Sequence, residues 1–377
     1  MSTTICIAAN TIDYPKGGGH FWVYLNWALG FRSIGCNVIW LELIDSGKPM
    51  DGIRDHAAIL KHKLSAYGFE HDLALADIKG RDIPAELHLY AMDIVMAAEI
   101  SDLIINQFYD LPLHILGRFR RSALLDIDPG LLQNWMYHKV INVQKHDIYF
   151  TIGETVGRPG ALFPDCGIKW EYTPPAVSLP HWPVKPAPAN APFTTLSHWN
   201  MDLYEEEDGE YYKNDKRAGF LPYLELPKKT GIPLELAIFL GENENPEREE
   251  LQALGWRIKD SQIVASTPMR YQDYIQNSPG EFSCVKPSCV KLQNAWISDR
   301  TICYLASGKP AVIEHTGNSR FLPGNAGLLR FRNFDEALKC LDEVLLNYDK
   351  HSAMARALAE EYFDAKKVAR GLLEKAL

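Results

Sequence analysis

The sequence has little that would support a disulfide framework, a membrane span or a nucleic-acid surface. Its 377 residues include only seven cysteines, an odd number scattered along the chain, which predicts free thiols in a reducing compartment. No apolar run reaches the roughly 18 residues that a membrane-spanning helix needs, and the first residues do not resemble a signal peptide. With 39 Lys and Arg against 48 Asp and Glu, the net charge of −9 argues against nucleic-acid binding. We therefore expect a cytoplasmic protein with no transmembrane segment and no nucleic-acid partner.

Three familiar site signatures are also missing. No second Cys or His pair accompanies Cys284 and Cys289, so a structural zinc site is not expected. The stretch 17–22 reads Gly-Gly-Gly-His-Phe-Trp and lacks the Gly-x-Gly-x-x-Gly of dinucleotide-binding domains. No Gly-Lys-Ser or Gly-Lys-Thr follows it, as a P-loop would require. These absences disfavour a dehydrogenase and a P-loop enzyme.

What the sequence does have is three adjacent glycines at the first turn of a predicted β-α-β unit. Residues 4–10 have the short apolar pattern of a buried strand, residues 21–34 show helical spacing, and 37–43 resume as a strand. Glycines 17–19 would let a ligand approach bare backbone, and the N–H groups that open the helix favour an anion. The alternative is a merely flexible turn, but three glycines exceed what a tight turn needs.

Strands and helices alternate along the rest of the chain, which predicts an α/β protein with parallel sheets. Ligands then bind outside the carboxyl ends of the strands, where the glycine-rich and carboxylate-bearing turns fall. The strands expected after the first unit are 101–106, 122–128, 147–153, 192–197, 234–240, 262–265, 280–286 and 309–315. The expected helices are 85–99, 113–119, 300–306, 334–347, 353–363 and 366–377.

A proline-rich segment divides the chain into two halves. Seven prolines between 174 and 192 predict stiff, extended backbone, either an interdomain connector or a long surface loop within one domain. Because the α/β alternation restarts after it, we expect one domain over 1–180, a linker over 181–192 and a second domain over 193–360. The last segment, 361–377, is expected to be a helix that packs back on the first domain.

A second candidate anion site opens the predicted helix after residue 298. Ser298 and Asp299 are good N-cap residues, and Arg300 and Thr301 would lie in the first turn. Free N–H groups, a hydroxyl and a guanidinium at one helix end suit a diphosphate. The alternative is that Ser298 and Asp299 only cap the helix and that Arg300 is solvated.

The order of these motifs resembles that of the GT-B glycosyltransferases, particularly the family-4 group. Gly18-Gly19 through 35–38 is similar to their Gly-Gly turn, helix and Gly-His-x-Val, and 287–288 through 306–312 is similar to their Pro-Ser and Ala-x-Gly-x-Pro segments. The tail 355–364 resembles their closing helices. Two glutamates of the family-4 pattern are replaced by Ala295 and Cys303, so the contacts of those glutamates do not carry over.

The resemblance implies two Rossmann-like, doubly wound domains that face a central cleft. It implies transfer of a sugar from a nucleotide-diphosphate-sugar, bound to the C-terminal domain, to a saccharide, lipid-linked or small-molecule acceptor on the N-terminal domain. Neither a metal nor another cofactor is expected. Asp126-Ile-Asp128 has the Asp-x-Asp pattern that holds a divalent metal in other glycosyltransferases, but it lies in the N-terminal half, away from the expected donor phosphates. A nucleotide-sugar epimerase and an inactive nucleotide-sugar-binding scaffold remain as alternatives.

The resemblance also suggests residue roles. His20 would remove the acceptor proton, oriented by Asp126 or Asp128, although a structural role or a contact to the donor sugar is the alternative. The family has a basic pair that binds the diphosphate in this region, and Lys213 is the first choice for it, with Lys216 and Arg217 close by. The alternative is that Lys213 is a solvated charge near the acidic run 205–208. Trp199 could contact the donor or belong to the core. The residues expected to bind the donor are Gly18, Gly19, Ser197, Asn200, Lys213, Lys286, Ser298, Asp299, Arg300 and Thr301.

Overall fold

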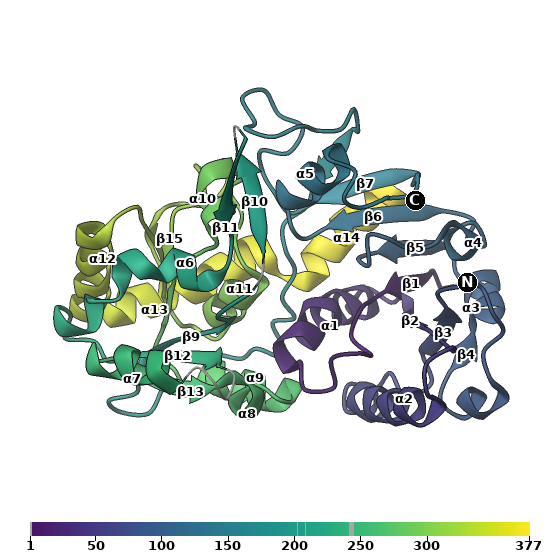
Figure 1. Ribbon diagram of the computed structural model, residues 1–377, viewed down its shortest axis with the longest axis horizontal. Coiled ribbons are helices and arrows are strands. Elements are labelled where there is room, and N and C mark those ends of the chain that lie inside the picture. The colour runs from purple at the N-terminus through teal and green to yellow at the C-terminus, as the bar shows by residue number, and fades with distance from the viewer. Residues whose placement is uncertain (1, 202, 208, 241–244) are drawn as a thin grey trace. The chain divides into compact units, whose positions relative to one another are not determined.

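The chain divides into two compact units, each built around one sheet (Figure 1). The computed structural model describes all residues except 1, 202, 208 and 241–244. The first unit comprises Met1–Gly157, Pro164–Ser178 and Ala365–Leu377, and the second comprises Arg158–Phe163 and Leu179–Asp364. The predicted α/β class, with two Rossmann-like sheets, is confirmed. None of the helices in the described part of the chain is long and apolar enough to cross a membrane.

The first unit contains an eight-stranded parallel sheet of order β4-β3-β2-β1-β5-β6-β7-β8. The chain starts in the middle, adds strands on one side, and then crosses to β5 on the other side of β1. This switch point is where doubly wound sheets bind ligands. Strands β1, β3, β5 and β6 are buried along their whole length, as parallel strands covered on both faces must be. The strands are β1 Thr4–Ala8, β2 Asn37–Ile44, β3 Leu73–Asp77, β4 Met92–Asp93, β5 Leu103–Asn106, β6 Ser122–Asp126, β7 Ile148–Thr151 and β8 Trp170–Tyr172.

The helices of this unit are α1 Gly18–Ser33, α2 Met50–Ser65, η1 Ala85–Leu89, α3 Ile94–Ile100, α4 Leu113–Leu116, α5 Leu131–Tyr137 and α14 Ala365–Ala376. The single helix expected over 85–99 is wrong: a 3-10 turn, the short β4 and α3 replace it, and the Asp93 side chain caps α3 by accepting from Met96 N at 2.9 Å. Helix α14 packs against α1 (Figure 1). A Cβ on Gly30 would lie 2.7 Å from Ala365 O, so a glycine is needed for this approach.

The second unit contains a seven-stranded sheet of order β13-β12-β9-β14-β15-β17-β16, parallel except for β16. Here the switch point lies between β9 and β14. Its core is aromatic, with the Phe282 and Phe331 rings stacked at 5.3 Å between centroids. The strands are β9 Phe193–His198, β12 Leu234–Phe239, β13 Arg257–Asp260, β14 Glu281–Ser283, β15 Ala311–Glu314, β16 Asn325–Ala326 and β17 Leu328–Phe331.

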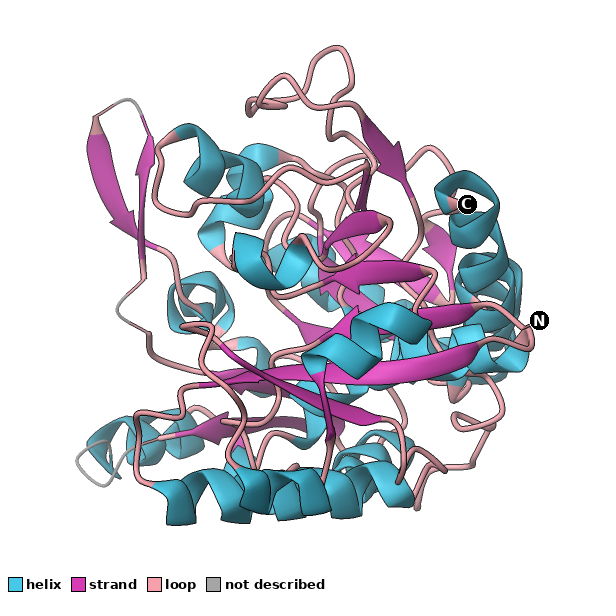
Figure 2. Ribbon diagram, turned by 90° about the vertical axis from the view of Figure 1, so that its right-hand side faces the viewer, coloured by secondary structure: helices cyan, strands magenta, loops and turns pink. Residues whose placement is uncertain are grey.

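The strand predicted over 262–265 is wrong, because these residues lie at helix α8. The Asp260 side chain caps this helix by accepting from Gln262 N at 2.8 Å. The helices are α6 Lys216–Phe220, η2 Leu221–Tyr223, η3 Leu226–Lys228, α7 Asn245–Ala253, α8 Ser261–Val264, α9 Pro268–Gln276, α10 Pro287–Leu292, α11 Asp299–Ala306, α12 Phe334–Leu346, α13 Tyr348–Leu358 and a π-helical turn Ala359–Phe363. Strands β10 Tyr204–Glu207 and β11 Glu210–Lys213 form a separate antiparallel hairpin (Figure 2).

The proline-rich segment over 181–192 packs within the second unit. Trp182 is fully buried, and its carbonyl accepts from Arg356 Nη1 at 2.9 Å. Gln276 donates to the carbonyl of Pro183 at 3.3 Å, and Lys309 Nζ donates to the carbonyl of Lys185. Prolines lack an N–H but keep a carbonyl, so neighbouring helices hold this segment through its acceptors.

Candidate functional site

Arg300 joins the N-terminus of α11 to the switch point of the second sheet. Its Nε donates to Glu281 Oε1 at 2.7 Å, Nη1 to the carbonyl of Leu196 at 2.8 Å, and Nη2 to Ser283 Oγ at 2.7 Å. The side chain is 11% exposed and that of Glu281 is fully buried. Burial would lower the pKa of Arg300, but the adjacent Glu281 carboxylate raises it above its usual value. Arg300 is therefore a buried, permanently charged side chain that links α11 to β9 and β14 through hydrogen bonds.

The four residues predicted at this helix start do lie there. Ser298 is the N-cap, with its Oγ accepting from Arg300 N at 3.2 Å. Asp299 opens the helix and Thr301 is buried. Arg300 is not solvated, and three of its donors are occupied within the protein. These contacts contradict the solvated alternative, and the role of Arg300 in binding a diphosphate stays a prediction.

Lys216 is the cation best placed to meet a ligand at this edge. It is the first residue of α6, which Asp215 caps by accepting from Ala218 N at 2.8 Å. Lys216 Nζ donates to the carbonyl of Cys284, directly after β14, at 2.6 Å. A Cβ on Gly219 would lie 1.9 Å from Val285 O, so only glycine allows α6 to approach this segment so closely. The close approach fixes the Lys216 ammonium at the end of β14.

The buried carboxylate of Glu314 acts electrostatically on Lys216 but forms no ion pair with it. In the described part of the chain, no carboxylate lies within ion-pair distance of Lys216 or of Lys286, the N-cap of α10. Burial lowers the pKa of Lys216 to about 8, helped by the positive charges of Arg300 and Lys286. Three cations thus surround the end of β14, with Glu281 as the ion-pair partner of one of them. Such a concentration of positive charge favours an anion.

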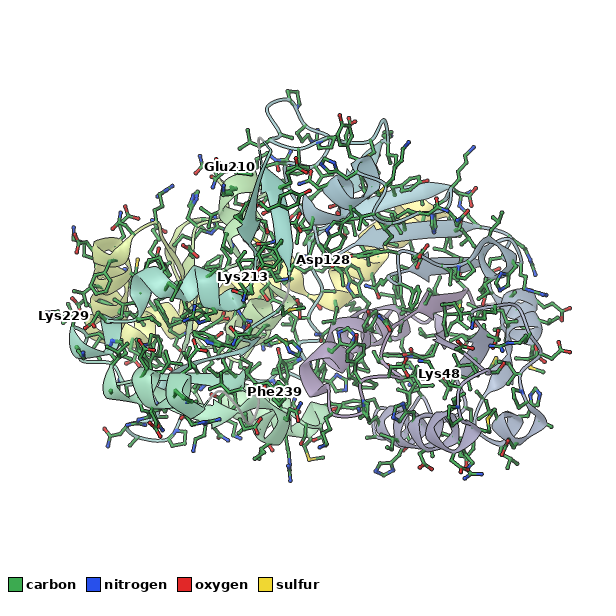
Figure 3. The ribbon with its side chains drawn as sticks, in the orientation of Figure 1. Lys48, Asp128, Glu210, Lys213, Lys229 and Phe239 are labelled. Carbon is green, nitrogen blue, oxygen red and sulfur yellow. The ribbon has the colours of Figure 1, made fainter. Side chains whose placement is uncertain are left out.

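The other cations near this edge are already paired. Lys213 ends β11 and lies 3.3 Å from the buried carboxylate of Asp215 (Figure 3). Arg217 pairs with Glu247. Lys216 is therefore a better candidate for a diphosphate ligand than Lys213, which was preferred from the sequence. The signal that could have separated them is the N-cap Asp215, which places Lys216 at the start of a helix. Asp208, at the end of the acidic run, lies outside the described residues.

The residues after β9 are less distinctive. Ser197 Oγ donates to the carbonyl of His198 at 3.0 Å, next to Leu196, whose carbonyl accepts from Arg300. Asn200 Nδ2 lies 3.5 Å from Glu247 Oε2. Trp199 is buried in the aromatic core, as the alternative interpretation had it. Ser197 thus lies at the cationic edge, whereas Asn200 is held by Glu247.

In the first unit, the glycine-rich turn places His20 near the end of β1. Gly17 N donates to Tyr14 O at 2.9 Å, and a Cβ on Gly17 would lie 3.1 Å from Tyr14 Cβ. Gly18 and Gly19 form the first turn of α1 and lie in this unit, not with the cations of the second. His20 Nε2 lies against the carbonyl of Asn10, and its ring meets Tyr14 and Tyr24 edge-on at 4.8 and 5.4 Å between centroids. Because a carbonyl can only accept, Nε2 carries the proton, and Nδ1 of the neutral ring carries the lone pair.

The two aspartates proposed to orient His20 differ in their surroundings. Asp126 is buried at the end of β6, and its oxygens accept from Asp128 N at 2.9 Å, Gln133 Nε2 at 2.9 Å and Thr151 Oγ1 at 2.7 Å. Burial raises the pKa of Asp126 to about 7. Asp128 is half-buried and accepts from Tyr109 OH at 2.9 Å. Asp126 is therefore a buried acceptor of three hydrogen bonds, and Asp128 is the more accessible carboxylate.

Glu42, a residue not predicted for the site, anchors the loop before the glycines. This buried carboxylate on β2 accepts from Thr11 N at 2.8 Å and from Trp40 Nε1 at 2.8 Å, and burial raises its pKa. A glutamate inside an otherwise apolar strand was the available signal, because such residues are rarely buried without partners. In the part of the chain that is described, no three His, Cys, Asp or Glu side chains are grouped as a metal site would require.

Comparison with known proteins gives a clear result only at the level of structure. No family model matches the chain, and no curated protein matches its sequence. An alpha-glucosyltransferase (AGT) in complex with UDP matches with a TM-score of 0.60 at 10% identity, over 100% of both chains. HepE of Anabaena in complex with UDP-glucose matches at 0.58 and 10% identity, over 99% of this chain and 98% of that one. Sucrose-phosphate synthase of Thermosynechococcus elongatus matches at 0.56 and 10% identity, over the same shares. The chain therefore has the fold of these glycosyltransferases, the GT-B fold.

Proposed function

We propose that this protein is a glycosyltransferase that moves a sugar from a nucleotide-diphosphate-sugar to an acceptor hydroxyl. Two observations support this proposal. AGT and HepE, which share its fold, were solved with UDP or UDP-glucose bound. The chain itself gathers positive charge at the carboxyl edge of its second sheet, beside the switch point where such sheets bind ligands. UDP is therefore the first nucleotide to test.

The observation that carries the proposal is the position of Lys216. When the bond between the sugar and the diphosphate breaks, negative charge grows on the leaving phosphate. A half-buried ammonium without a carboxylate partner stabilises that charge more strongly than a solvated lysine, because less of its field is screened by water. Lys286 and Arg300 add positive potential at the same strand end. With this charge supplied by side chains, the proposed reaction needs no divalent metal.

The acceptor chemistry is assigned to the first unit. His20, held near the end of β1 by its contact with the carbonyl of Asn10, is assigned as the base that receives the proton of the acceptor hydroxyl. Tyr14 and Tyr24 hold the imidazole ring from its edges. Asp128 acts electrostatically on Tyr24 and supplies a negative charge in this neighbourhood, which would favour the protonated imidazole. In this proposal Asp128, not Asp126, supports the base.

Binding of UDP tests the diphosphate site. We expect isothermal titration to show that Lys216→Ala weakens UDP by about tenfold or more, the loss of one charged hydrogen bond. Lys213→Ala, a matched change at a lysine already paired with Asp215, should alter the affinity by less than about twofold. Equal losses in the two variants, or no loss in Lys216→Ala, would remove Lys216 from the site.

Turnover tests the reaction itself. Incubation with a panel of nucleotide sugars, without an acceptor and in the presence of a chelator, should release nucleoside diphosphate slowly as water replaces the acceptor. Conversion of one nucleotide sugar into another would support the epimerase instead. Tight binding with neither product, even when candidate acceptors are supplied, would identify a nucleotide-sugar-binding scaffold. Activity that disappears with chelator and returns with a divalent metal would contradict metal independence.

A further inference from the structure

The β10–β11 hairpin is the part of the second unit that the proposed chemistry leaves unused. It is inserted directly after β9, at the carboxyl edge of the sheet, yet it pairs with no strand of that sheet. Figure 2 shows it standing clear of the seven-stranded sheet. Lone two-stranded hairpins are marginally stable, so this one depends on packing along one face. The other face is available for a ligand.

The strand register assigns each side chain to one of these faces. Tyr204 pairs with Lys213, and Glu206 with Tyr211. Residues directly opposite each other, and residues two apart on one strand, project to the same side. Tyr204, Glu206, Tyr211 and Lys213 therefore share one face, which we call the tyrosine face. Tyr212 belongs to the opposite face.

The face that carries Tyr212 is the packed one. The Lys291 ammonium of α10 lies 4.3 Å from the centroid of the Tyr212 ring, a cation–π contact. Tyr212 is half-buried, and burial raises its pKa to about 12. In contrast, Tyr204 is 55% exposed and Tyr211 is 73% exposed. Among the described residues, no side chain makes a ring contact or hydrogen bond with either of them, so the tyrosine face is open.

The chemistry of the tyrosine face is specific about what it can bind. Two phenol rings offer flat apolar surfaces with a polar edge, and the Glu206 carboxylate beside them is a hydrogen-bond acceptor. The Lys213 ammonium is already near Asp215, so the face as a whole carries no surplus positive charge. Sugar rings match such a surface, because their C–H faces pack on aromatic rings while their hydroxyls donate to carboxylates.

Other classes of ligand match less well. A single-stranded nucleic acid would also stack on the rings, but it requires a positively charged track for its phosphates, and the Glu206 carboxylate on the same face opposes it. Glu210, at the start of β11, adds a further negative charge to the hairpin (Figure 3). A membrane surface requires aliphatic side chains flanked by lysines, and the tyrosine face has no aliphatic residue. A neutral, polyhydroxylated chain is the ligand that this combination of rings and charge favours.

We propose that the tyrosine face binds a neutral saccharide chain, which serves as the acceptor of the proposed glycosyl transfer. That the saccharide is an acceptor rests on the proposed function. The proposal specifies the acceptor as an oligosaccharide, where the proposed function required only a compound with a hydroxyl group. Its physical basis is the hairpin alone: two exposed tyrosines and a carboxylate on one face of a ladder that starts where β9 ends.

The test separates saccharide binding from catalysis. The full chain is applied to an array of neutral and anionic oligosaccharides, and the hits are confirmed by saturation-transfer NMR without any nucleotide sugar. We expect a neutral oligosaccharide to bind, the Tyr204→Ala/Tyr211→Ala double variant to lose about tenfold or more of that affinity, and Tyr211→Phe to keep it. Tyr137→Ala, which removes a tyrosine that is 63% exposed on α5, is the matched control and should bind as the wild type does. Thermal melting confirms that each variant is folded.

Three outcomes overturn the proposal. Two of them are that the wild type retains no oligosaccharide, and that the double variant binds the same oligosaccharide with unchanged affinity. Preference for anionic chains, with a steep loss of binding in salt, would also overturn it, because the face would then act as a charged surface. Release of UDP from UDP-glucose by the wild type is measured in parallel. Failure there, with saccharide binding intact, would refute the transferase proposal while leaving the saccharide-binding face in place.

Discussion

UDP affinity should fall as the pH rises past the pKa of Lys216, and this dependence tests the cationic site directly. Burial lowers that pKa from 10.5 to about 8. The charged and titratable groups around the ammonium are Arg300, Lys286, Cys284, Cys289 and Glu314. Burial raises the pKa of Cys284 well above its usual value, and Arg300 stays charged, so neither changes its charge between pH 7 and 9. Lys216 is therefore a group at this strand end expected to titrate in that range, and the Lys216→Arg control below separates its contribution from that of its neighbours.

The magnitude follows from the fraction of Lys216 that is charged before binding. With a pKa of about 8, roughly nine-tenths of the side chain is protonated at pH 7 and roughly one-tenth at pH 9. A diphosphate at the ammonium favours the charged form and raises its pKa again. If the bound complex stays protonated over the whole range, the association constant falls about tenfold from pH 7 to pH 9, or ~1.4 kcal/mol. The direction is fixed: binding takes up a proton, so alkaline pH opposes it.

Isothermal titration of UDP at pH 7, 8 and 9 measures this effect, and buffers of different ionisation enthalpy count the protons taken up. Lys216→Arg is the matched control, because a guanidinium stays charged over the whole range and other titrating groups are unchanged. We expect the affinity of this variant to be nearly independent of pH. A wild-type affinity equal at pH 7 and pH 9, or an equal slope in Lys216→Arg, would refute the reasoning.

The other predictions concern residues that hold the sites in place. Arg300→Ala should lower the free energy of unfolding in urea by about 3–5 kcal/mol, because it leaves the buried Glu281 carboxylate without its partner. A loss below about 1 kcal/mol would contradict the stabilising role of this ion pair. Gly219→Ala should destabilise the protein by about 1–3 kcal/mol and weaken UDP binding, because the new Cβ would lie 1.9 Å from Val285 O, and a variant with wild-type melting and affinity would show that α6 can shift freely. His20→Ala should reduce the turnover number by about a hundredfold or more while UDP affinity stays within about twofold, and full activity would exclude it as the base. The pKa of Asp126 is about 7 in the folded protein, against an ordinary value of 3.8, so between these pH values the native state binds a proton that the unfolded state does not. The free energy of unfolding should therefore fall as the pH rises through that range in the wild type. In Asp126→Asn this fall should be absent.

Much of the fold could be predicted from local pattern. Short apolar runs such as residues 4–10 and 122–128 became buried parallel strands, because strands covered on both faces need apolar side chains on both. The pattern was misleading where capping decided the outcome. Residues 262–265 look like a strand but lie at α8, whose N-cap Asp260 supplies a hydrogen bond that apolar periodicity does not reveal.

The position of the candidate residues at strand ends could be predicted, but their contacts could not. Parallel α/β sheets place ligands at the carboxyl ends of their strands, and the candidate residues of both units do lie at such ends. The roles depend on partners distant in sequence. Arg300 pairs with Glu281 and with Leu196, which is 104 residues away, and Lys216 meets Cys284, which is 68 residues away. No periodicity encodes which of several cations will meet a carboxylate.

The amino-acid order by itself determined the class of this protein: alternating strands and helices, a glycine turn before α1, and an acidic chain without long apolar runs. These features arise from interactions between residues close in sequence. The tertiary structure alone decided that Arg300 forms a buried ion pair with Glu281, while Lys216 donates to a backbone carbonyl and forms no ion pair among the described residues. The reason is physical, because the behaviour of an ionisable group depends on burial and on nearby charge, and both are created only when distant segments pack together.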